Sequence, residues 1–149
     1  MFKKIRNWAL LSMLSVAAVP AVAQEVTWQV PTSVPEGSPF YVNFLERFAE
    51  NVDVLTNGRV LIEPFGAGVL VPALQVYDGV RDGIVEAGHS TPSYLVNQDP
   101  TNAIFAGFPG GMGPEAYVTW IYEKGGKEKL AELRAKDGFK NLIVGIGSS

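Results

Sequence analysis

Segments with strand periodicity alternate along this chain with segments of helical periodicity, and this order is the strongest constraint on its fold. Residues 26–30 alternate apolar and polar side chains, which predicts a strand. From residue 41 the spacing changes to three and four, which predicts a helix. Its expected inner face consists of Tyr41, Phe44, Leu45, Phe48, Val52 and Leu55. Asn57-Gly58 should end this helix, because both residues tolerate positive φ.

The same alternation continues to the end of the chain. The predicted elements are a strand at 60–64, a helix at 72–82, a strand at 84–90, helices at 114–123 and 127–136, and a strand at 141–145. Leu74, Tyr77 and Val80 should face inward from the helix at 72–82, and residues 91–113, rich in Gly and Pro, should form a long irregular connection. This order predicts an α/β fold: a mainly parallel sheet with helices on both faces and right-handed crossovers.

The first 23 residues have the three-part pattern of a secretory signal peptide. A basic start with Lys3, Lys4 and Arg6 precedes an apolar run, and Ala21-Val22-Ala23 supplies the small residues of a cleavage site. The run is shorter than the roughly 20 residues that span a bilayer. We expect cleavage after Ala23 and a periplasmic mature chain, 24–149, that does not span the membrane; a membrane anchor or a buried helix is the alternative.

Charge and cysteine content narrow the classes of partner. The chain has 12 basic and 15 acidic residues, and three of the basic ones lie in the predicted signal peptide. The remaining acidic surface argues against nucleic acid and against anionic lipid as partners, because both carry negative charge. There is no cysteine, so the exported chain must rely on its apolar core rather than on disulfides.

His89 is the only histidine and lies near the end of the predicted strand at 84–90. Without a second histidine or a cysteine, a His/Cys metal cluster is excluded. A nucleophile triad could use only His89, and the adjacent Ser90 would point to the opposite face of a strand. A polar residue that lines a pocket or packs in the core is the favoured interpretation, and a secreted enzyme that uses His89 is the alternative.

Other conspicuous residues carry weaker signals. The glycine loops at 66–68 and 107–113 lack the full dinucleotide and phosphate-loop patterns. Basic residues from Lys124 to Lys136, Arg134 among them, alternate with glutamates and predict a solvated helix face. Four loop aromatics could either wall a small-ligand cleft or plug the core: Phe65, Tyr94, Phe105 and Phe108.

A series of short motifs resembles one known family. The motifs are Val26-Thr27-Trp28, Asn57-Gly58-Arg59-Val60, Phe65-Gly66-Ala67-Gly68-Val69-Leu70-Val71-Pro72, Leu74-Gln75, Gly83-Ile84-Val85-Glu86-Ala87-Gly88-His89, Asp99-Pro100, Phe108-Pro109-Gly110-Gly111-Met112, Trp120 and Gly125-Gly126. In this order they resemble the DctP-type substrate-binding subunits of tripartite ATP-independent periplasmic (TRAP) transporters. The Val-Thr-Trp strand, the Asp-Pro loop and the Gly-Gly break are most similar to the branch that binds α-keto acids.

The resemblance implies a type II periplasmic-binding-protein clamshell that closes on an organic acid. Residues 24–149 would be its first lobe, truncated near the hinge, with the second lobe missing. In the family an arginine of the second lobe fixes the ligand carboxylate, and its equivalent lies beyond Ser149; Arg134 is not that residue by position. The positions that match cleft-facing loops are Thr32, Ser33, Phe65, His89, Ser90, Thr91, Tyr94 and Ser148.

The resemblance also implies partners and an ion. The ligand would be an α-keto acid or a C4-dicarboxylate, handed to two membrane subunits, small and large, that an ion gradient drives. No cofactor is expected, although a sodium ion is possible with the ligand, held largely by residues further along the chain. A neighbouring ATPase gene would instead indicate an ABC importer, and a truncated fragment without function is a further alternative.

Overall fold

Two parallel strands and the helix between them begin the fold. The computed structural model describes residues 24–147, so the predicted signal peptide lies outside the described residues. Strand β1 (Val26–Pro31) pairs in parallel with β2 (Val60–Phe65), with Val26 opposite Val60 and Pro31 opposite Phe65. A π-helical turn, η1 (Tyr41–Glu46), runs into helix α1 (Arg47–Thr56) between the strands. Both predicted strands and the helix are confirmed.

The face that α1 and η1 turn towards the strands forms the first apolar cluster. Tyr41 and Leu45 are buried against Val30 and Ile62, which come from the two strands. Phe48 and Val52 pack at the edge of this cluster. The prediction fails at Leu55, which is 84% exposed. Periodicity places Leu55 on the inner face, but it lies in the last turn of α1, where no described residue covers it.

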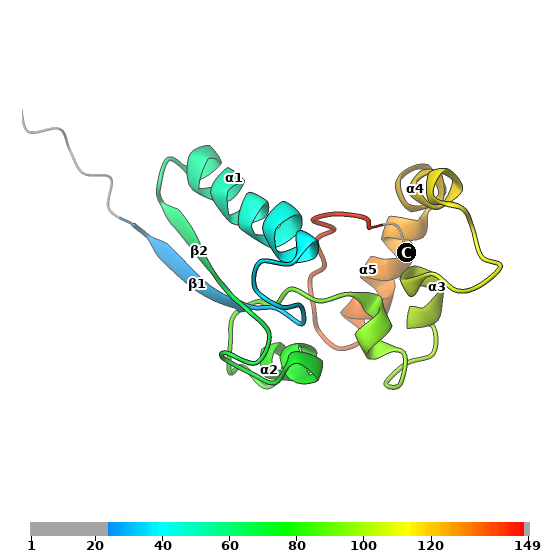
Figure 1. Cartoon of the computed structure of the whole chain (residues 1–149), viewed down its shortest axis with the longest axis horizontal. Coiled ribbons are helices and arrows are strands. Elements are labelled where there is room, and N and C mark those ends of the chain that lie inside the picture. Colours follow the sequence, from blue (N-terminus) through cyan, green and yellow to red (C-terminus); the bar gives the residue numbers. More distant parts are fainter. Residues whose placement is uncertain (1–23, 148–149) are drawn as a thin grey trace, which may run out of the picture.

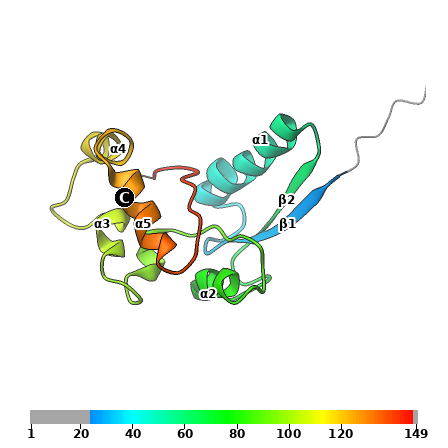
Figure 2. The ribbon, with the colours of Figure 1, turned by 180° about the vertical axis from the view of Figure 1, so that it is seen from behind.

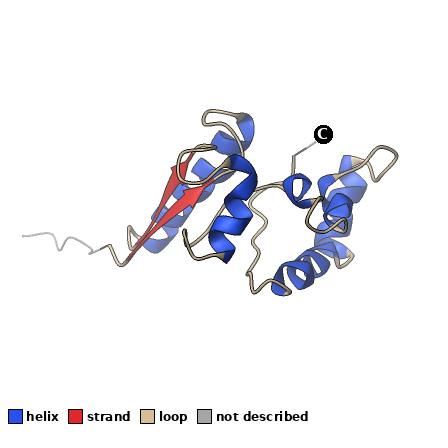
Figure 3. Ribbon diagram, turned by 90° about the horizontal axis from the view of Figure 1, so that it is seen from below, coloured by secondary structure: helices blue, strands red, loops and turns tan. Residues whose placement is uncertain are grey.

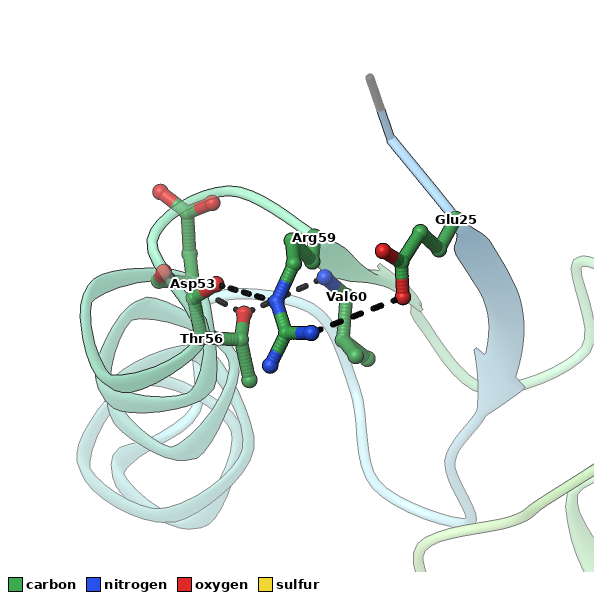
Figure 4. Close-up of polar contacts among 5 residues, drawn as sticks. All are labelled: Glu25, Asp53, Thr56, Arg59 and Val60. Atoms are coloured by element: carbon green, nitrogen blue, oxygen red, sulfur yellow. Dashed lines mark hydrogen bonds and ion pairs between the residues drawn. The ribbon is translucent and has the colours of Figure 1, made fainter. Parts of the chain in front are cut away.

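The turn from α1 into β2 is fixed by a small polar network, drawn in Figure 4. Asn57 and Gly58 adopt positive φ values of 55° and 76°, as the sequence predicted. The Thr56 hydroxyl accepts a hydrogen bond from the Val60 backbone N–H at 3.1 Å, which joins the helix end to the strand start. Arg59 donates from Nε to the Thr56 carbonyl at 3.2 Å, and its Nη1 lies 3.7 Å from Glu25 Oε2.

The rest of the described chain is helical or irregular. The remaining elements are η2 (Ala73–Gln75), α2 (Val76–Arg81), η3 (Pro92–Leu95), α3 (Asn102–Ala106), α4 (Pro114–Glu123) and α5 (Gly126–Ala135). Helices α1 and α2 lie on opposite sides of the two strands (Figures 1 and 3), which confirms helices on both faces of a parallel sheet. No helix among residues 24–147 is long and apolar enough to cross a membrane.

Helices α3, α4 and α5 form the other end of the elongated molecule (Figure 2) and hold a second apolar cluster. Its buried residues are Phe105, Ile121, Leu130 and Leu133. The predicted Gly125-Gly126 break is confirmed: Gly125 has φ 86°, and a Cβ on Gly126 would lie 2.9 Å from the Ile121 Cα. Glycine therefore lets α4 and α5 approach each other closely.

Two predicted strands are wrong. Residues 84–90 contribute a single parallel bridge, Thr32 to His89, because the segment turns at Gly83 and the N–H of Ile84 bonds back to Gly79. Residues 141–145 form no regular element and pair with no strand among the described residues. In this C-terminal segment Ile143 and Ile146 instead pack on the second cluster.

The predicted irregular connection and one predicted inner face also need correction. Residues 91–113 contain η3 and α3, helices too short to produce a periodic pattern. Within the predicted helix at 72–82, Leu74 is 63% exposed, whereas Val76 and Gly79 are buried. The register is shifted because residues 73–75 form a separate 3-10 turn ahead of α2.

Candidate functional site

The carboxyl end of β1 meets the segment that follows α2, and this junction brings two pairs of predicted ligand residues together. Backbone bonds fix the junction: His89 N–H donates to the Pro31 carbonyl at 2.9 Å, and Ser33 N–H donates to the His89 carbonyl at 3.0 Å. Beside them, Thr32 Oγ1 lies 2.7 Å from His89 Nδ1. Ser33 Oγ lies 2.8 Å from Ser90 Oγ. We call Thr32, Ser33, His89 and Ser90 the junction residues.

The other predicted residues lie around this junction to different degrees. Phe65 is half-buried, and its carbonyl accepts the Thr32 N–H at 2.9 Å, so it belongs to the same strand end. The hydroxyls of Thr91 and Ser93 bond to each other just beyond Ser90. Tyr94 is 38% exposed on η3. Ser148 lies outside the described residues.

The Thr32–His89 pair is a partly buried and uncharged polar contact. Thr32 is fully buried, and its hydroxyl oxygen already accepts the Val34 N–H at 3.3 Å. The hydroxyl proton is therefore available to Nδ1, which would place the imidazole proton on Nε2. Burial lowers the pKa of His89, because desolvation penalises the charged imidazolium. The junction thus contains hydroxyls and a neutral imidazole rather than a fixed positive charge.

The lowered pKa of His89 predicts a pH-dependent stability. The unfolded chain binds a proton near pH 6.5, whereas the folded chain binds it only at lower pH. The free energy of unfolding should therefore fall as the pH drops below about 6.5 and level off below the folded pKa. Urea unfolding at a series of pH values measures this effect. The His89→Gln variant should lose this component, and an identical slope in the variant would contradict the assignment.

The described residues contain no cluster of acidic or histidine side chains of the kind that holds a metal ion. Among residues 24–147 no group of three or more His, Asp or Glu side chains is placed to hold a metal ion. The junction residues are hydroxyls and one imidazole that is already bonded through Nδ1. They do not match the carboxylate and carbonyl oxygens that hard cations prefer. The described residues thus supply no cluster of acidic or histidine ligands for the sodium ion that the family resemblance allows, and its binding by residues further along the chain stays a prediction.

The sequence interpretation missed a second polar cluster, at the other end of the molecule. Arg134 was expected on a solvated helix face, but it is only 8% exposed. Its Nη2 donates to Asn102 Oδ1 at 2.7 Å, and its guanidinium carbon lies 5.4 Å from the centre of the Tyr77 ring. The correction has a physical cause: the alternation with glutamates concerns neighbours on α5, whereas burial comes from α2 and α3, which lie far away in sequence. Only the spacing of Leu130, Leu133 and Arg134 hinted at it.

Parallel strands with polar loops at their carboxyl ends define an α/β lobe of the ligand-binding type, since ligands bind at that edge of such sheets. The comparisons with known proteins agree with this class. Residues 31–147 match the family described as "Bacterial extracellular solute-binding protein, family 7", also called DctP. The chain belongs to this family.

One curated relative and two solved structures place the chain within the family. A monocarboxylate 2-oxoacid-binding periplasmic protein of Nostoc sp. is 34% identical over 129 residues, 87% of this chain and 35% of the relative. A TRAP transporter solute-binding protein of Bordetella bronchiseptica, with calcium and picolinate in its site, has a TM-score of 0.70 at 28% identity, covering 76% of this chain and 34% of that one. One from Pseudoalteromonas atlantica, with sodium and pyruvate bound, has a TM-score of 0.71 at 25% identity, covering 77% and 35%. The chain spans about a third of the length of these relatives.

Proposed function

We propose that this chain forms the first lobe of the periplasmic substrate-binding subunit of a TRAP transporter. The lobe would present one wall of a cleft that captures a small organic acid and delivers it to the two membrane subunits. The observation that carries the proposal is the junction of hydroxyls and a neutral imidazole at the carboxyl end of β1, in a chain of the solute-binding family. Export through the signal peptide at 1–23 and cleavage after Ala23 are part of the same proposal.

The chemistry of the junction favours a 2-oxo acid over a C4-dicarboxylate. The half-buried Ser90 hydroxyl and an Nε2–H donor on His89 suit a carbonyl or one carboxylate oxygen, while the buried Thr32 and Ser33 hydroxyls hold them in place. They provide no fixed positive charge for a second carboxylate. The curated relative is described as a monocarboxylate 2-oxoacid-binding protein, which supports the same choice. The positive charge that balances the ligand would come from the arginine that the family resemblance places in the second lobe, and any cation would be bound largely there as well.

The alternative of a secreted enzyme that uses His89 has little support. Thr32, the hydroxyl nearest the imidazole, is fully buried and cannot reach a substrate. Within the described residues no carboxylate hydrogen-bonds to His89, so the third member of a triad is missing. The family is one of binding proteins, and we propose that this chain is not an enzyme.

The proposal predicts where pyruvate binds. In a ¹H–¹⁵N titration of the purified protein, pyruvate should cause saturable shifts centred on residues 32–33 and 89–91. Binding should be weak, because a single lobe leaves the ligand exposed to water. Ser90→Ala should weaken the affinity about three- to tenfold, the effect of losing one hydrogen bond. Thr119→Ala, which removes an exposed hydroxyl from α4, should leave the affinity unchanged.

Two results would contradict the proposal. One is the absence of saturable shifts with pyruvate in a protein whose amide chemical-shift dispersion shows that it is folded. The other is binding that Ser90→Ala leaves unaffected, with the shifts located on α3 to α5. Tighter binding of succinate than of pyruvate at the junction would overturn the choice of a 2-oxo acid and keep the binding function.

A further inference from the structure

Gly88 lies directly before His89, where the segment that follows α2 reaches the carboxyl end of β1. Its neighbour Ala87 packs against the first apolar cluster, which η1, α1 and the two strands form. Gly88 faces α2 instead: a Cβ on this residue would lie 2.6 Å from Val76 Cγ1 and 3.1 Å from Val80 Cγ2. The backbone that leads into His89 is therefore held between the first cluster and α2.

A Cβ at position 88 could be accommodated only if α2 or the segment itself moved. Non-bonded carbon atoms prefer a separation of about 3.5–4.0 Å, so the contact with Val76 would be about 1 Å too short. The Val76 side chain is only 2% exposed at the start of α2, so packing leaves it little space to move into. Gly88 does not have a positive φ, so glycine is needed here for the close approach and not for an unusual backbone angle.

The hydrogen bonds that such a shift would break first are those of the junction. His89 N–H donates to the Pro31 carbonyl at 2.9 Å, and the His89 carbonyl accepts the Ser33 N–H at 3.0 Å. A displacement of about 1 Å would take both pairs of atoms beyond hydrogen-bond distance. The side-chain pairs from Thr32 to His89 and from Ser33 to Ser90 share this backbone register, so they would separate as well.

We propose that Gly88 is a positioning residue for the ligand wall. Because it has no side chain, α2 can hold the segment that ends in His89 and Ser90 against the carboxyl end of β1. Both residues then keep their partners on β1 and present their donors together. This role rests on the proposed function of the junction residues as one wall of an organic-acid cleft, and it adds α2 to the parts of the lobe that determine affinity.

Amide hydrogen exchange of the Gly88→Ala variant measures the junction directly. The N–H groups of His89 and Ser33 should exchange at least about tenfold faster than in the unsubstituted protein, because their bridge is lost. The Thr32 N–H donates to the Phe65 carbonyl at 2.9 Å, on the β2 side of the same strand, and its exchange should change much less. A general loss of stability would instead accelerate all three amides alike.

The affinity for pyruvate should fall at least about tenfold in Gly88→Ala, since the donors of His89 and Ser90 no longer converge. The ¹H–¹⁵N titration measures this loss. Gly113→Ala is the matched control, because it adds the same methyl group at a glycine that has φ −65° and no other atom within 4 Å of the new Cβ. It should leave both the affinity and the exchange of the junction amides unchanged.

Val76→Ala tests whether the contact with α2 is the cause, because it removes the carbon atom nearest to the added Cβ. Alone, it should lower the unfolding free energy by leaving a cavity, while the bridge at His89 remains. In the double variant Val76→Ala/Gly88→Ala the Cβ has room, apart from a slight shift of Val80. Pyruvate affinity and the exchange of the bridge amides should then return to within about threefold of the Val76→Ala values.

Equal affinity and equal amide exchange in Gly88→Ala and Gly113→Ala would overturn the positioning role. So would an acceleration in Gly88→Ala that is the same for the His89, Ser33 and Thr32 amides and that Val76→Ala does not reverse. If Gly88→Ala fails to fold, the double variant is compared with Val76→Ala, and loss of the bridge in the double variant alone overturns the proposal. Absence of pyruvate binding in the unsubstituted protein would contradict the proposed function, and the exchange comparison would still decide the role of Gly88.

Discussion

Replacing Leu45 with alanine should cost about 2–5 kcal/mol of unfolding free energy, the largest stability loss expected from a single core substitution in the strand half of the molecule. Leu45 is 2% exposed in the cluster formed by η1, α1 and the two strands. Truncation removes buried methyl groups and leaves a cavity between the helix and the sheet, and the backbone can close that cavity only in part. Urea or thermal unfolding followed by far-UV circular dichroism measures the loss.

Leu55→Ala is the matched control, because it makes the same chemical change at an 84% exposed position on α1, the helix that continues from η1. It should change the unfolding free energy by less than about 0.5 kcal/mol, since alanine is also a good helix former. The two variants test periodicity against the structure. Periodicity alone assigns both leucines to the inner face, whereas the structure buries Leu45 and exposes Leu55. Equal losses in the two variants would mean that another part of the protein covers Leu55, and that the described surface of α1 is incomplete.

Replacing Asn102 with alanine should destabilise the helical half by about 3 kcal/mol, because it leaves several buried polar groups without partners. Asn102 is 2% exposed, and its Nδ2 donates to the carbonyls of Leu95 at 3.2 Å and Asp99 at 2.8 Å. Its Oδ1 accepts from Arg134 at 2.7 Å. One amide therefore ties η3, the turn before α3, and α5 together.

Asn97→Ala is the control for this prediction. Asn97 is exposed in the turn after η3 and is close in sequence to Asn102. Its replacement should leave the unfolding free energy within about 0.5 kcal/mol of the unsubstituted protein. Unfolding by urea, followed both by tryptophan fluorescence and by circular dichroism, compares the two variants. An Asn102→Ala protein as stable as Asn97→Ala would show that the amide is not needed to satisfy the buried carbonyls.

Prediction from the sequence succeeded for elements whose formation depends mainly on the residue pattern within the element itself. The strands β1 and β2, the helix between them and the helices α4 and α5 follow from local periodicity and from glycine or asparagine at the ends. It failed for residues 84–90 and 141–145, whose composition suits a strand: in the described chain the first segment forms one bridge, Thr32 to His89, and the second forms none. Composition reports the propensity of a segment, and pairing depends on a neighbour that the segment does not encode.

The candidate site shows the same division. The family resemblance placed Thr32, Ser33, His89 and Ser90 at cleft-facing positions, whereas the residue pattern alone put His89 and Ser90 in a strand. The sequence did not predict which of these side chains would hydrogen-bond to each other. The bonds from Thr32 to His89 and from Ser33 to Ser90 join residues 57 positions apart. Their partners are set by the single backbone bridge at His89.

The amino-acid order by itself determined the α/β class, the parallel arrangement and the motif series of the solute-binding family. Those features depend on local periodicity and on short motifs, both of which are visible in one chain read in order. Only the tertiary structure decided that Leu55 is exposed, that Arg134 is buried beside Tyr77 and Asn102, and that the third strand is one bridge. Burial and polar pairing depend on which distant segment lies alongside, and packing of the whole chain settles that.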